Sequence, residues 1–283
     1  MAAVTKPGTR AFLYVFVALV LITMLFPFYW VANMSLQTSN QLYDIPPHFW
    51  PPQPTLENFR SVLLEERGLM RFYDAVFNTL IVAAVAMSVC VALGSITGYA
   101  LARLNFRWGL WFLFVLISTQ MVPPLVDLIP LYIIFSRILK LLDTKLALII
   151  GYTGWLLPIS VWILYGYFQT IPRDLESAAR IDGCTRMQAL FRVVMPLSAP
   201  GIAATAIYVF ISSTNEFLFA MIFTSTRRSI TIPVALSDMI GKYQIRYGDM
   251  TAGAVIAAAL PVILALLFQK YLVQSLTSGG VKG

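Results

Sequence analysis

The sequence predicts an all-α membrane protein with six transmembrane helices and a charged two-helix loop between the fourth and the fifth. Of its 283 residues, 59% are hydrophobic and only 12% are charged, whereas soluble domains carry about 25% charged residues. The apolar residues gather in runs of roughly 20 residues, the length at which a helix crosses a bilayer. Residues 171–200, called the charged loop below, form the longest charged interruption in the second half.

The six predicted spans follow the apolar runs in order, and one transmembrane domain is expected to cover residues 1–283. The first span follows Lys6 and Arg10 and has no small-residue cleavage site after it, so we expect a retained helix and not a signal peptide. The proline-rich segment 35–74 that follows is predicted to face solvent, extended in part. The spans are expected at about 12–34, 75–101, 109–135, 146–168, 201–223 and 250–272.

Glycines and prolines mark two of these spans. Gly94 and Gly98 in the second span have the GxxxG spacing, which either lets two helices approach closely or reflects glycine tolerated in a membrane helix. Three prolines, Pro123, Pro124 and Pro130, interrupt the third span. A break in the third helix is therefore expected there.

The charged loop reads as two short helices joined by a tight turn. Pro172 suits a helix start, and Gly183 supplies the left-handed conformation that commonly ends a helix. Thr185 followed by Gln188 predicts a capping box at the start of the second helix. This second helix is expected to stop before Pro196, because proline disfavours helical geometry in the preceding residue. A compact charged unit held between two spans is typical of a docking surface.

Six spans place both termini on one side of the membrane, and the charged loop on that same side. The predicted topology divides the 20 Lys and Arg equally between the two sides. The first helix usually dominates orientation, and it has Lys6 and Arg10 before it but no basic residue after it until Arg60. This asymmetry favours cytoplasmic termini and a cytoplasmic charged loop.

The chain lacks the sets of residues that several kinds of catalytic, metal and nucleotide site require. One histidine and two distant cysteines, Cys90 and Cys184, supply no catalytic triad, disulfide framework or metal centre. The Gly241–Lys242 pair lacks the rest of a Walker A loop. We therefore predict no catalytic, cofactor-binding or metal site, and an ATP-driven process needs another subunit. The net charge of +7 is spread over short loops, which favours lipid headgroup contact over nucleic-acid binding.

Polar residues within spans are candidates for a translocation path, because charges inside a membrane usually face a cavity or a partner. Asp127 lies among the prolines of the third span, where bonding to backbone groups freed by those prolines is the alternative. Asn215 and Glu216 lie in the fifth span, where bonding between helices is equally compatible with the sequence. The neighbouring serines and Thr214 are expected to bond back to their own helix.

The segment LESAARIDG at residues 175–183, followed by Met195–Pro196, resembles the EAA loop of permease subunits of binding-protein-dependent ABC importers. The order of features over nearly the whole chain resembles the carbohydrate-uptake branch and its maltose-permease-like subunit. The Asn215–Glu216 pair and the glycine-rich residues 279–283 fit this likeness. Thr214 departs from it, since the family often has tryptophan at this position.

The resemblance implies that Glu176, Ala178, Ala179, Asp182 and Gly183 lie on a coupling helix seated in a cleft of an ATPase subunit. Alanines let a helix approach a partner closely, and the carboxylates of Glu176 and Asp182 offer charge-assisted bonds to a partner's Arg or Lys. Gly183 permits the sharp turn.

The implied protein is a permease subunit in the plasma membrane of a bacterium or archaeon, forming half of a translocation path for a sugar or sugar-like solute. Its implied partners are a second homologous permease, an ATPase dimer that binds ATP and Mg, an extracytoplasmic solute-binding protein and membrane lipid. A permease for a phosphorylated polyol or a polyamine is the alternative within transport. A membrane-embedded enzyme using Asp127 and Glu216 as an acid–base pair is the alternative outside it.

Overall fold

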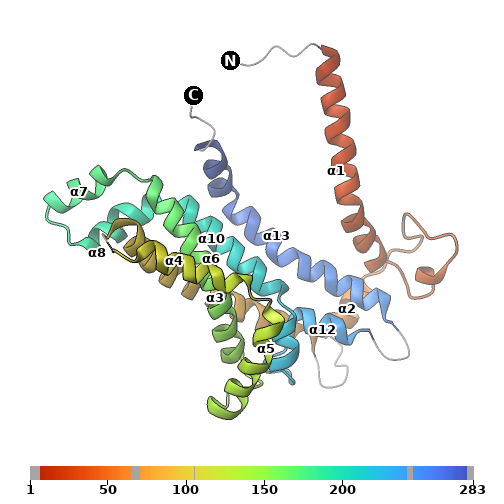
Figure 1. The fold of residues 1–283 in the computed structure, drawn as a ribbon. Coiled ribbons are helices and arrows are strands. Elements are labelled where there is room, and N and C mark those ends of the chain that lie inside the picture. The colour runs from red at the N-terminus through yellow and green to blue at the C-terminus, as the bar shows by residue number, and fades with distance from the viewer. Residues whose placement is uncertain (1–6, 65–70, 105, 241–244, 279–283) are drawn as a thin grey trace. The chain divides into compact units, whose positions relative to one another are not determined.

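The computed structural model describes residues 7–64, 71–104, 106–240 and 245–278, and these are almost entirely helical (Figure 1). Within them, four helices are long and apolar enough to cross a membrane, or up to six spans exist if each of two bent helix pairs counts as one. The predicted all-α membrane fold is confirmed. The four long helices are α1 (Pro7–Ser35), α3 (Phe72–Arg103), α6 (Lys145–Thr170) and α13 (Tyr247–Ser278).

The chain folds as two compact units. The first comprises Met1–Glu65 and Asp238–Ala257, and the second comprises Glu66–Ser237 and Ala258–Gly283. This division concerns packing within the chain, so the single transmembrane domain expected for residues 1–283 stays a prediction.

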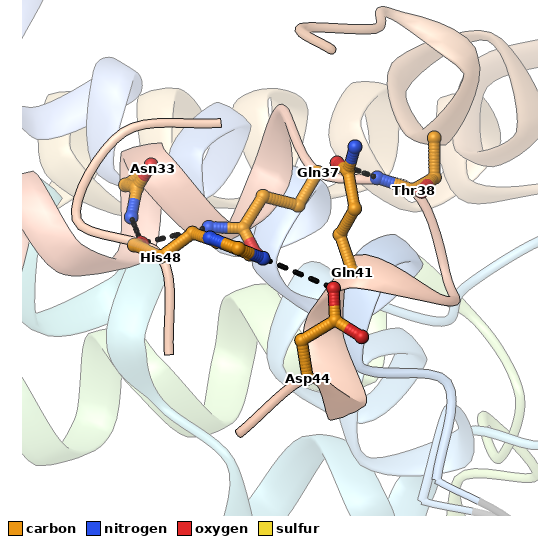
Figure 2. A network of polar contacts seen from close by, with 6 residues as sticks. All are labelled: Asn33, Gln37, Thr38, Gln41, Asp44 and His48. Carbon is orange, nitrogen blue, oxygen red and sulfur yellow. Dashed lines mark hydrogen bonds and ion pairs between the residues drawn. The ribbon is translucent and has the colours of Figure 1, made fainter. Parts of the chain in front are cut away.

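In the first unit, the proline-rich segment after α1 is held by polar contacts (Figure 2). The His48 carbonyl accepts hydrogen bonds from Asn33 Nδ2 at 2.8 Å and from Gln37 Nε2 at 3.2 Å. The His48 ring lies 3.0 Å from the Asp44 carboxylate. The segment also contains a 3₁₀ turn and the short helix α2 (Glu57–Leu64), so it is more ordered than the sequence predicts.

Asn58 of α2 ties this segment to the start of α13. Its Nδ2 donates to the carbonyls of Ser35 at 2.9 Å and Gln37 at 2.7 Å. A Cβ atom placed on Gly248 would lie 2.5 Å from Asn58 Oδ1. Glycine is therefore required where α13 passes this amide.

The second unit is built on α3, α6 and α10 (Ala199–Asn215), which pack against one another (Figure 1). A Cβ atom on Gly94 would lie 3.1 Å from Leu164 Cδ1, and one on Gly98 would lie 3.0 Å from the Tyr165 amide nitrogen. The GxxxG pair therefore lets α3 approach α6 closely, as the first of its two interpretations predicts. Buried side chains between these helices include Val82, Ala86, Cys90, Leu148, Tyr152, Leu156 and Val209.

The predicted third span is broken, as its prolines indicate. It consists of α4 (Gly109–Ser118), a 3₁₀ turn and α5 (Pro124–Ile133), with a bend of 93°. Val122 has the extended conformation that a following proline imposes, and α5 begins directly after Pro123.

The predicted fifth span, 201–223, is interrupted at Glu216. α10 ends at Asn215, Glu216 is extended, and α11 (Leu218–Phe223) starts two residues later. A further short helix, α12 (Ile232–Asp238), follows after a loop.

The charged loop contains α7 (Arg173–Ile181) and α8 (Arg186–Ala189), which lie at one end of the second unit (Figure 1). The expectation that its second helix stops before Pro196 is wrong. A π-helical turn (Leu190–Val194) and α9 (Met195–Leu197) continue it through the proline, and the 79° bend into α10 comes only at Ser198. The wider π turn, in which the Met195 amide bonds to the Leu190 carbonyl, accommodates the proline ring.

Candidate functional site

The turn between α7 and α8 has the local geometry that its sequence predicts. Gly183 has φ of +93°, the left-handed conformation. The Cys184 amide donates to the Ala179 carbonyl at 3.0 Å, and the Gly183 amide donates to the Arg180 carbonyl at 3.2 Å. These two bonds form a Schellman motif, which satisfies the last carbonyls of α7.

The capping box is also present at the start of α8. The Gln188 amide donates to Thr185 Oγ1 at 3.3 Å, and the Thr185 amide donates to Gln188 Oε1 at 2.8 Å. Both turn predictions are confirmed. Together these hydrogen bonds define the turn that joins α7 to α8.

One face of the charged loop is exposed along α7 and its turn. Ala178, Asp182 and Gly183 are exposed, and Ala179 is half-buried. The large apolar side chain of Ile181 is 86% exposed at the end of α7. Within the described residues, the Asp182 carboxylate has no hydrogen-bond or ion-pair partner. This face thus offers small residues, a free carboxylate and apolar surface, a combination typical of protein docking sites.

Glu176 has a different environment, because its carboxylate turns back toward α3. Tyr99 Oη donates to Glu176 Oε1 at 2.5 Å, and Arg103 Nε lies 3.5 Å from Glu176 Oε2. The carboxylate therefore already has two partners within the chain, unlike that of Asp182. The spacing of Tyr99 and Arg103 places both on one helical face, but nothing in the sequence pairs that face with Glu176.

Asp127 lies in the first turn of α5 and lines a cavity of about 440 Å³. Gln120 and Trp155 also line it, and Gln120 Nε2 donates to the Trp155 carbonyl at 3.0 Å. The Gln120 amide oxygen and the Asp127 carboxylate accept no hydrogen bond from the described residues. The sequence left open that Asp127 bonds to backbone groups freed by the prolines. No such bond is present among the described residues. The cavity thus presents two free acceptors beside an aromatic ring.

Asn215 and Glu216 do not line this cavity. Glu216 Oε1 accepts from the Phe219 amide at 3.0 Å, and Oε2 accepts from the Ala220 amide at 3.2 Å. Glu216 therefore satisfies the first amides of α11 and joins two helices, while Asn215 is exposed at the end of α10. Thr214 Oγ1 donates to the Ile211 carbonyl at 3.0 Å, which confirms the predicted bond to its own helix. The same prediction is wrong for Ser213, whose buried hydroxyl has no hydrogen-bond partner among the described residues.

Asp143 and its hydrogen-bond partners, called the polar lock below, lie at the end of α6 opposite to α7. The sequence did not predict this cluster. Asp143 accepts from the amides of Ser225 at 2.8 Å and Thr226 at 2.9 Å. It also accepts from the hydroxyls of Thr226 at 2.7 Å and Ser229 at 2.5 Å. Partial burial raises the pKa of Asp143, but these hydrogen bonds outweigh it and lower the pKa to about 2.

Lys145 and Asn78 extend this lock to α3 and α6. Lys145 Nζ donates to Asn78 Oδ1 at 2.8 Å and to the Arg228 carbonyl at 2.6 Å. Asn78 Nδ2 donates to the carbonyls of Arg227 and Ile230, both at 2.9 Å. The loop between α11 and α12 is thereby fixed to two long helices. Within the described residues, no group of His, Cys, Asp and Glu side chains comes together to hold a metal ion.

Comparison with protein families finds a match over residues 90–278 to the family described as binding-protein-dependent transport system inner membrane component. Among curated proteins, the chain is 35% identical to the sulfoquinovosyl glycerol transport system permease protein of Agrobacterium fabrum, covering 99% of this chain and 98% of that protein. It is 36% identical to the trehalose/maltose transport system permease protein of Thermococcus litoralis, covering 97% of each.

A trehalose transport system permease protein of Mycobacterium tuberculosis is 34% identical, over 92% of this chain and 93% of that protein. Among solved structures, a chain of a bacterial ABC transporter involved in alginate import superposes with a TM-score of 0.75 at 22% identity. The match covers 95% of this chain and 99% of that one. At that identity, the structural likeness concerns the fold alone.

Proposed function

Because the chain belongs to the family of binding-protein-dependent transport system inner membrane components, we propose that it is the permease subunit of an ATP-driven importer for a sugar or sugar-like solute. One observation carries the proposal. The relatives named as permeases for trehalose, maltose and sulfoquinovosyl glycerol align with nearly the entire chain at 34–36% identity. A second permease supplies the other half of the path, and a solute-binding protein delivers the solute.

The exposed face of the charged loop is the proposed seat for the ATPase. Ala178 and Ala179 allow close approach, Asp182 has a carboxylate free for a partner's Arg or Lys, and Gly183 forms the turn. In this assignment ATP and Mg are held by the ATPase dimer, and the charged loop and both termini are cytoplasmic. The protein is a multi-pass component of the plasma membrane.

The cavity beside Asp127 is the proposed point where this subunit meets the solute. Sugar hydroxyls are hydrogen-bond donors, and the Asp127 carboxylate and Gln120 amide oxygen are acceptors with space before them. Trp155 adds an aromatic wall of the kind that lines small-molecule sites. Asn215 and Glu216 then act at the edge of the path, where Glu216 holds the break between α10 and α11.

Transport requires the complex to switch between an inward-open and an outward-open state. ATP binding closes the ATPase dimer, which moves the charged loop and shifts the spans from inward-open to outward-open. Nucleotide and solute-loaded binding protein drive this shift only insofar as they bind the two states with different affinity.

Purification of the chain from its native membrane, with identification of the co-purifying subunits, tests the proposal. We expect a second permease and an ATPase. The purified complex is then placed in vesicles with its solute-binding protein and ATP, and uptake of radiolabelled trehalose and maltose is measured. A complex without an ATPase would refute the permease assignment. A binding protein that binds no sugar, but instead a phosphorylated polyol or polyamine, would refute the sugar assignment alone.

A further inference from the structure

The contacts of Glu176 give α7 two faces with different roles. Tyr99 and Arg103 lie one helical turn apart on α3 and reach the two oxygens of the same carboxylate, at 2.5 and 3.5 Å. We call these three residues, Tyr99, Arg103 and Glu176, the α3 clasp. Ala178 of α7 and Asp182, directly after its end, are exposed and take no part in the clasp.

The charged members of the α3 clasp are shielded from solvent. The side chain of Arg103 is 4% exposed and that of Glu176 is 14% exposed. An exposed ion pair contributes little, but removing one partner of a shielded pair leaves an uncompensated charge and is strongly destabilising. The clasp is therefore expected to stay closed while the charged loop moves.

Backbone contacts reinforce the clasp in both directions. Arg103 Nη2 of α3 donates to the carbonyl of Ile171, just ahead of α7, at 2.7 Å. Arg173 Nη2, at the start of α7, donates in return to the carbonyl of Ala102 in α3 at 3.3 Å. The two elements are thus joined through side chains and main chain together, so that neither can shift alone.

An apolar layer surrounds the clasp and includes both α6 and the π-helical turn. The Tyr99 ring meets the Phe168 ring edge to face, with centroids 6.3 Å apart. Since α3 also packs closely on α6 through Gly94 and Gly98, displacement of the clasp displaces both helices. The buried members of the layer are Tyr99, Ala102, Leu164, Phe168, Ile171, Leu190 and Val194.

We propose that Tyr99 and Arg103 are positioning residues for energy coupling, which act by fastening Glu176 and so carry the movement of α7 into α3 and α6. This inference rests on the proposed permease function. It assigns the Glu176 carboxylate to an intrachain link and leaves ATPase contact to the exposed face of α7. Loss of the clasp leaves the ATPase seated but separates ATP hydrolysis from movement of the spans.

Tyr99→Phe tests this inference with the loss of one hydroxyl group, and Tyr165→Phe in α6 is the matched control. Tyr165 packs against the same apolar layer, but its hydroxyl accepts from Gln169 and takes no part in the clasp. The whole complex is reconstituted in vesicles, and the ATP hydrolysed per molecule of trehalose or maltose imported is measured. We expect this ratio to rise at least threefold in Tyr99→Phe, with unchanged ATPase co-purification and melting temperature, and to stay constant in Tyr165→Phe.

Glu176→Gln and the double variant with Tyr99→Phe complete the test. If Glu176 acts through Tyr99, the double variant has the same ratio as Glu176→Gln alone. If Glu176→Gln uncouples transport while Tyr99→Phe does not, Glu176 acts on the ATPase and the inference is overturned. The same holds if the increases in the ratio caused by Glu176→Gln and Tyr99→Phe multiply in the double variant. A wild-type complex that imports no sugar would instead count against the proposed function, because the ratio of ATP hydrolysed to sugar imported is defined only when the wild type imports sugar.

Discussion

Gly201→Ala is expected to destabilise the junction between the charged loop and α10. A Cβ atom at this position would lie 2.4 Å from Tyr167 Cγ, 2.5 Å from Cδ2 and 2.9 Å from Cβ. Carbon atoms in contact prefer a separation of about 3.5–4.0 Å. The ring of Tyr167 must therefore move by about 1 Å or more, or α10 must shift away from α6.

Adding a methyl group to a well-packed site typically costs about 1–3 kcal/mol. That cost corresponds to a shift of about 5- to 150-fold in the folding equilibrium. The assay heats detergent-solubilised protein over a series of temperatures and measures the fraction that remains monodisperse on size-exclusion chromatography. We expect the midpoint of Gly201→Ala to fall by several degrees relative to wild type.

Gly166→Ala is the matched control, because a Cβ at Gly166 meets no atom within 4 Å. It places the same methyl group on α6 without overlap and should be neutral or slightly stabilising, since alanine is the better helix former. Tyr167→Ala combined with Gly201→Ala removes two of the three close contacts and should recover part of the loss. Equal midpoints for Gly201→Ala and Gly166→Ala would refute the packing argument.

Three further outcomes follow from the described contacts. Asp143 has a pKa of about 2, below the usual 3.8, so its stabilisation is complete above about pH 4 and is lost as the pH falls toward 2. After allowance for solvent screening, Asp143→Asn should lower the free energy of unfolding by about 1 kcal/mol at pH 7 and speed tryptic cleavage at Arg227. Equal cleavage rates of wild type and variant would contradict this. Asp127→Asn should raise the KM for the solute about 10-fold or more with little change in basal ATPase activity, which uptake kinetics measure. Gly183→Val should destabilise the turn by about 1–2 kcal/mol, because the position has a positive φ. Solute import should fall, while membrane insertion measured by immunoblot stays normal.

Local rules read from the sequence predict the short-range features of this chain well. Gly183 and the Thr185–Gln188 capping box form as expected, because their hydrogen bonds join residues within one or two helical turns. The apolar runs likewise predict the long helices, since a bilayer leaves a long helix as the simplest way to pair every backbone group. The prolines of the third span predict its break for a similarly local reason.

Features that depend on distant residues were not predictable in the same way. Glu176 bonds to Tyr99, 77 positions earlier, and Asp143 bonds to a loop more than 80 positions later. Nothing in a single sequence pairs such segments before the fold is known. Glu216 differs again, because its carboxylate serves the amides of the next helix and interrupts a run that reads as one continuous span.

The continuation of the helix through Pro196 affects how the charged loop transmits movement. A helix ending before Pro196 would place a flexible joint directly behind the docking surface. Instead the helical path from Arg186 runs through the proline to Leu197, and the 79° bend follows at Ser198, whose hydroxyl donates to the Val194 carbonyl at 2.7 Å. Leu190 and Val194 of the π turn lie in the same apolar layer as the clasp residue Tyr99. Force applied to α7 thus reaches α3 through the clasp, and it reaches α10 through the Gly183 turn, the helical path from Arg186 to Leu197 and the bend at Ser198.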